Sequence, residues 1–148
     1  DASSIAHYAE GNMLKALEAI HLNEDKELFF ELFVSLMRLA YQRKIRDMKQ
    51  WSETMASMGR ERQKHFLLYC QDMIRENFMY NFHQTSLIHL NHKEEHFSKR
   101  FAPFVNEKNI INLMYELNEA LRHIEQNVNA RMVFFDLSLK TIVSLVQK

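Results

Sequence analysis

The sequence predicts an all-α protein: a helical bundle of about five long helices, preceded by two short ones. Two observations carry this prediction. First, the 148 residues include only two glycines and one proline, whereas a sheet protein needs such turn residues every ~8–12 positions. Second, apolar residues recur three and four positions apart along most of the chain, which is the spacing of one helix face. The length suits one domain with its own core.

The first 22 residues predict the two short helices, separated at Gly11-Asn12, because glycine is a weak helix former. Asn23 then has the character of an N-cap, and acidic residues follow it in the first turn, where the helix dipole favours them. The helix that starts there is expected to run past Ile45. Its apolar face consists of Leu28, Phe29, Leu32, Phe33, Leu36, Leu39 and Ala40.

Three helices are expected in the middle of the chain. The first covers about 48–58 and ends at Gly59, the second covers about 60–82, and a short charged helix covers about 92–101. Pro103 should end the short one, because proline cannot continue a helix. Trp51, in the first of the three, has two interpretations: a core residue or an anchor at an interface.

The last part of the chain predicts two more helices. Asn106 should cap the first of them, and the second should begin near Asn129. In the first of these helices, apolar residues are spaced alternately four and three positions apart. This spacing forms an apolar seam along one side of the helix, which suits antiparallel helix packing. The seam consists of Ile110, Met114, Leu117, Leu121, Ile124 and Val128.

Charge and cysteine content bear on nucleic-acid binding, on the role of Cys70 and on the location of the protein. Lys+Arg and Asp+Glu both total 19, so no basic excess favours nucleic acid, and we expect no direct contact with it. The single cysteine, Cys70, lies at helical spacing from Phe66 and Ile74, which favours a core residue over a nucleophile. One cysteine cannot form an internal disulfide, which favours a reducing, cytoplasmic location. No segment reaches the ~18 apolar residues of a membrane span.

One motif offers a catalytic alternative. The stretch HKEEH fits the pattern H-x-x-E-H of one metalloprotease class, in which His92 and His96 would share a zinc ion and Glu95 would act as base. His89 adds a third nitrogen nearby. The other interpretation is a solvated, charged helix, since three ligands must converge before such a pattern is a metal site. Without a phosphate-binding loop, dinucleotide fingerprint or nucleophile elbow, we predict no catalytic residue, cofactor or metal.

Asp136 interrupts the apolar run MVFFDLSL near the C-terminus. An unpaired buried carboxylate is costly, so a helix buried only within its own domain would rarely place one there. In one interpretation Phe134 and Leu137 face the core, while Asp136 with Lys140 or Arg131 marks a polar seam against a neighbouring subunit. In the other, Asp136 is exposed and paired with Lys140 four residues on, a contact of ~0.2–0.5 kcal/mol.

Two stretches resemble the bacterial clamp loader, the part of DNA polymerase III holoenzyme that loads the sliding clamp. The first, IAHYAEGNMLKALEAI, resembles the closing helices of an AAA+ lid domain. Leu14 stands where an ATP-hydrolysing member would have its sensor arginine. Because a leucine cannot contact a γ-phosphate, the resemblance implies a subunit that does not itself hydrolyse ATP.

The second stretch, NVNARMVFFDLSLKTIVSL, is similar to the last collar helix of clamp-loader subunits. The matching positions are Asn129, Arg131, Asp136, Leu137, Leu139 and Lys140. The resemblance is to the delta-prime or delta subunit, and it implies that residues 1–22 end a lid domain and residues 23–148 form a C-terminal collar domain.

The resemblance implies a structural role in which collar domains hold the loader ring together during clamp loading. The expected partners are gamma/tau-type subunits and the other delta-type subunit. Asn129, Arg131, Asp136 and Lys140 are the expected subunit-interface residues. Two alternatives stay open: a small helical zinc-dependent hydrolase that uses HKEEH, and a stand-alone adaptor that binds an amphipathic partner helix.

Overall fold

The computed structural model describes residues 13–82 and 90–146, with side chains from residue 25 onward. These residues form six α-helices, one 3-10 helix and no strand, so the all-α prediction is confirmed. The elements are α2 (Met13–Gln42), α3 (Ile45–Ala56), α4 (Arg60–Tyr80), α5 (His92–Phe101), the 3-10 helix η1 (Ala102–Phe104), α6 (Ile110–Glu125) and α7 (Ala130–Val146).

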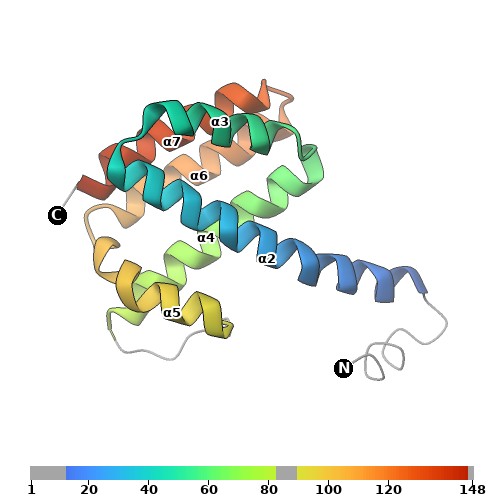
Figure 1. Ribbon diagram of the computed structural model, residues 1–148, viewed down its shortest axis with the longest axis horizontal. Helices are drawn as coiled ribbons and strands as arrows, with labels where there is room; N and C mark the ends of the chain where they lie inside the picture. Colours follow the sequence, from blue (N-terminus) through green and yellow to red (C-terminus); the bar gives the residue numbers. More distant parts are fainter. Residues whose placement is uncertain (1–12, 83–89, 147–148) are drawn as a thin grey trace.

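Helix α2 lies across the bundle and packs against α3, α4 and α7 (Figure 1). Helices α4 and α6 form one closely packed pair and α3 and α7 another, and α6 also packs against α7. The centre is aromatic: the ring centroid of Trp51 lies 6.0 Å from that of Phe66 and 5.9 Å from that of Phe134. The Trp51 indole donates a hydrogen bond to the Leu32 carbonyl oxygen at 3.1 Å. Trp51 is therefore a core residue.

The predicted break before Asn23 is wrong, because α2 continues without interruption from Met13 to Gln42. The 30 residues contain neither glycine nor proline, and an asparagine inside a helix costs less than ~1 kcal/mol relative to alanine. The preference of Asn23 for an N-cap position is therefore too small to interrupt a helix that the residues on both sides favour. The predicted short helix over residues 1–10 lies outside the described residues.

The other end of α2 also differs from the prediction, since the helix stops at Gln42 instead of passing Ile45. Arg43 has φ +55°, and the Lys44 amide donates to the Leu39 carbonyl oxygen at 3.0 Å. This is a Schellman-type end, in which glycine is the usual left-handed residue. An arginine takes that place here, so composition contains no signal for it.

Several predicted boundaries are confirmed. Gly59 has φ +87° and precedes α4, α5 ends at Phe101 before the turn that contains Pro103, and α7 begins directly after Asn129.

Helix α6 starts later than predicted, at Ile110. The side-chain oxygen of Asn106 accepts hydrogen bonds from the amides of Lys108 and Asn109, each at 2.9 Å, so it caps the preceding turn. The buried face of α6 is also shifted, because the helix packs between α4 and α7. Of the predicted seam, Val128 is exposed; the buried apolar residues are Leu113, Leu117, Ala120 and Ile124.

Candidate interaction surface

The inner face of α7 belongs to the core. Val133, Phe134 and Leu137 are buried, which the sequence predicts for Phe134 and Leu137. The Phe134 ring lies 6.2 Å from that of Phe66. The hydroxyls of Ser138 and Thr141 on this face donate to carbonyl oxygens of α7 itself, at 2.6 and 2.8 Å. Because these polar groups are satisfied within the helix, the inner face packs as an apolar surface.

Asp136 lies on the exposed side of α7. Its carboxylate is 2.9 Å from the Lys140 ammonium, which also lies 3.4 Å from the Glu116 carboxylate of α6. The hydrogen bond that Lys140 donates to the Asp136 carboxylate is the main cause that raises the pKa of Lys140. The predicted pair of Asp136 with Lys140 is confirmed. A carboxylate can occur in this apolar run because its side chain is exposed to solvent and lies next to a cation.

A second acidic residue of α6 is paired in the same way. The Arg122 guanidinium lies 2.5 Å from the Glu119 carboxylate, and this hydrogen bond lowers the pKa of Glu119. The charged side chains along the line where α6 meets α7 thus largely neutralise one another.

The other two predicted interface residues lie elsewhere on α7. The Asn129 side chain accepts a hydrogen bond from the Met132 amide at 3.1 Å, and so caps the helix. Arg131 lines a groove of about 380 Å³ between α3 and α7, beside Lys49 and Glu53. It is five residues from Asp136, which turns a helix by about 140°. The structure therefore brings Asp136 and Lys140 together but places Arg131 on the opposite flank.

The outer face of α7 carries apolar residues that are not among the predicted interface residues. Met132, Val143 and Val146 are 65%, 61% and 52% exposed. Phe135, Leu139 and Ile142 are half-buried beside them. The sequence contained part of this signal, because Arg131, Asp136 and Lys140 are the only charged residues of α7 and are too few to make its whole exposed side polar. On α6, Ile111 and Tyr115 are also exposed.

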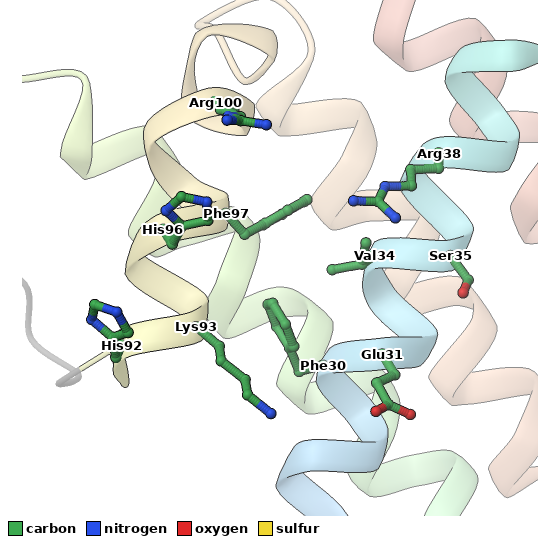
Figure 2. A pocket seen from close by; sticks show the side chains of 10 residues that line it. All are labelled: Phe30, Glu31, Val34, Ser35, Arg38, His92, Lys93, His96, Phe97 and Arg100. Carbon is green, nitrogen blue, oxygen red and sulfur yellow. The ribbon is translucent and has the colours of Figure 1, made fainter.

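The zinc-dependent hydrolase alternative requires at least three His, Cys, Asp or Glu side chains close enough to hold a metal ion, and the described residues contain no such group. His89 lies outside the described residues. His92 and His96 line a groove between α2 and α5, whose lining does not include Glu95. Figure 2 shows both imidazoles on the α5 side of this groove. Cys70 is fully buried, as expected of a core residue, and burial raises the pKa of its thiol well above the usual value.

The neighbouring carboxylate, Glu94, is buried and structural. It accepts hydrogen bonds from the Asn91 amide at 2.9 Å and the Tyr69 hydroxyl at 2.5 Å, and the Asn91 side chain accepts from the Glu94 amide in return. This is a capping box that starts α5. Burial and the Glu94 hydrogen bond together hold the pKa of Tyr69 far above its ordinary value.

Among the helices described, none is both long enough and apolar enough to cross a lipid bilayer. No protein-family model, curated protein or solved structure gives a significant match to the chain.

Proposed function

We propose that this chain is the collar and oligomerisation domain of a clamp-loader subunit of DNA polymerase III holoenzyme, of the delta-prime or delta type. In this role it binds neighbouring subunits and holds the loader ring together while the sliding clamp is loaded in the cytoplasm. The proposal is supported by the resemblance of the last helix to a collar helix. The structural observation that carries it is the exposed apolar face of α7.

An exposed apolar helix face calls for a partner. Helices that are apolar on all sides are normally buried on all sides, and the centres of protein interfaces are apolar with a polar rim. On α7, Met132 and Val143 would supply part of the centre. The paired charges of Asp136, Lys140 and Glu116 would form one rim, and Arg131 the opposite one.

The proposed neighbours are gamma/tau-type subunits and the other delta-type subunit. The domain contributes buried area and geometry to the ring, whereas ATP hydrolysis and DNA contacts belong to other parts of the loader. The adaptor alternative uses the same surface for an unrelated helix, so the identity of the partner separates the two.

The proposal is tested with the double variant Met132→Glu/Val143→Glu. Because both side chains are exposed, the variant should keep the circular dichroism spectrum and melting temperature of the parent. It should bind gamma/tau-type subunits at least about tenfold more weakly, which corresponds to ~1.4 kcal/mol, as measured by surface plasmon resonance with the complete subunit.

The matched control is Ile45→Glu/Leu68→Glu, which places the same charges at exposed apolar positions on α3 and α4. It should bind within about twofold of the parent. If the parent itself does not bind gamma/tau-type subunits, or if the control weakens binding as much as the α7 variant, the proposal is wrong.

A further inference from the structure

A groove with an apolar floor runs between α2 and α5. The cavity has a volume of about 640 Å³, and Figure 2 shows Phe30, Val34 and Phe97 directed into the space between the two helices. The rings of Phe30 and Phe97 meet edge to face, with centroids 5.9 Å apart. All three side chains are only half-buried, so a ligand in the groove would contact them.

The groove continues along α2 toward its C-terminal end. A second cavity of about 310 Å³ shares Arg38, Phe97 and Arg100 with the first and extends to Tyr41 and Phe104. These last two rings are exposed and meet edge to face, with centroids 5.3 Å apart. A third cavity of about 720 Å³ shares Tyr41 and Phe104 with the second. We call the three neighbouring cavities together the α2–α5 groove; the third is lined by the end of α2, η1 and α7 and not by α5 itself.

The rim of the α2–α5 groove is basic. Arg38, Arg43, Lys93 and Arg100 line it, and Glu31 is the one acidic residue among the described residues that do so. None of these four cations forms an ion pair with another described residue. The groove therefore carries positive charge that the folded part of the chain described here does not neutralise.

We propose that the α2–α5 groove binds an acidic segment of a partner protein, in which Asp or Glu residues flank aromatic or large aliphatic side chains. The apolar side chains would lie on Phe30, Val34 and Phe97, and the carboxylates would pair with Arg38 and Arg100, which border two of the cavities. This site does not include Met132 or Val143 and does not depend on the clamp-loader proposal, although its third cavity borders the outer face of α7 at Ile142 and Val146.

The floor favours a peptide over nucleic acid. Much of it is aliphatic, with Val34, Met37, Ile142, Leu145 and Val146, and such side chains suit the packing of peptide side chains. Aromatic rings and a basic rim are also features of single-stranded nucleic-acid sites, but here the rings pack edge to face on one another, and Glu31 would oppose phosphates.

The test uses the whole chain and a fluorescein-labelled synthetic peptide in which acidic residues flank a central Phe-Leu pair. Fluorescence anisotropy should show saturable binding, and Arg38→Glu/Arg100→Glu should weaken it about tenfold or more. Both arginines are exposed, so the variant should remain folded by circular dichroism. The milder Arg38→Gln/Arg100→Gln should weaken binding less.

The matched control is Arg46→Glu/Lys49→Glu, which changes the net charge equally at exposed positions of α3 outside the groove. It should bind the peptide within about twofold of the parent, because remote surface charges are screened. Two control peptides, one with its acidic residues replaced by Asn or Gln and one with Phe-Leu replaced by Ala-Ala, should each bind more weakly.

Four results would overturn this proposal. These are no saturable binding at up to about 1 mM protein, equal losses in the groove and control variants, undiminished binding of either control peptide, and a single-stranded oligonucleotide of equal charge that binds as tightly and displaces the peptide. The last result would identify the groove as a nucleic-acid site instead.

Discussion

Helices α5 and α7 each bury one face, but their exposed faces differ. Among the described residues, α7 leaves apolar side chains without a partner, whereas α5 leaves cations without one. On α7 the exposed charges Asp136 and Lys140 pair with each other, while apolar side chains such as Val143 remain in solvent. On α5 the larger apolar side chains turn toward α2 and the core, while Lys93 and Arg100 carry unpaired charge. One helix exposes an excess of apolar surface and the other an excess of cations.

This difference points to two kinds of contact. A partner on α7 would gain mainly from burying apolar area, which salt affects little. A partner in the α2–α5 groove would gain from pairing charges near the surface, which salt screens. The first kind suits the permanent contacts of a ring, and the second suits a reversible contact. The following variants test this comparison, from the largest expected effect to the smallest.

The largest effect should separate the two faces of α7. Phe134→Ala removes a fully buried ring that contacts Trp51 and Phe66 and should lower the free energy of unfolding by ~3–5 kcal/mol. Met132→Ala, on the outer face, should change it by less than ~0.5 kcal/mol. Urea denaturation followed by circular dichroism measures both, and similar losses would mean that the outer face also belongs to the core.

A smaller effect should separate two neighbouring carboxylates of α5. Glu94→Ala removes the capping box and the hydrogen bond from Tyr69, and should cost ~1–3 kcal/mol of stability. Glu95→Ala, next to it, removes an exposed side chain with no such contacts among the described residues and should cost less than ~0.5 kcal/mol. Thermal and urea unfolding of the pair test this, and a larger loss for Glu95→Ala would contradict the structural role of Glu94.

The smallest effect on stability is expected at Asp136. Asp136→Leu removes one exposed ion pair with Lys140 and should change the free energy of unfolding by at most ~0.5 kcal/mol. Under the proposed function it should nevertheless weaken assembly with a neighbouring subunit, measured by size-exclusion chromatography with light scattering. An unfolded variant would instead show that Asp136 serves the core.

The sequence was most informative where the signal is local. Gly59 and Asn129 mark helix ends through their own backbone and side-chain chemistry, and both predictions are confirmed. Asn23 has an equally good local signal, yet the surrounding helix continues through it. Arg43 takes a left-handed conformation without any such signal. At Asn23 the cap signal is outweighed by the helix-forming residues around it, and the end of α2 at Arg43 has no glycine or asparagine that would mark it.

The candidate site also has features that the sequence predicts and features that only the tertiary structure shows. The Asp136–Lys140 pair follows from a spacing of four residues on one helix, so the sequence alone predicted it. The separation of Arg131 from Asp136 also follows from spacing on one helix, whereas the partnership of Lys140 with Glu116 required the placement of α6 beside α7. The α2–α5 groove was invisible for the same reason, since its two walls are formed by residues about sixty positions apart.

The sequence by itself determined that this chain is helical, and it determined the inward face of α7, because side-chain spacing and turn chemistry act within a few residues. Only the tertiary structure decided that Trp51 is core, that α7 keeps an apolar face in solvent, and that the cations of α5 meet Arg38 across a groove. These outcomes depend on which surfaces cover one another, and burial is settled by residues that are distant along the chain.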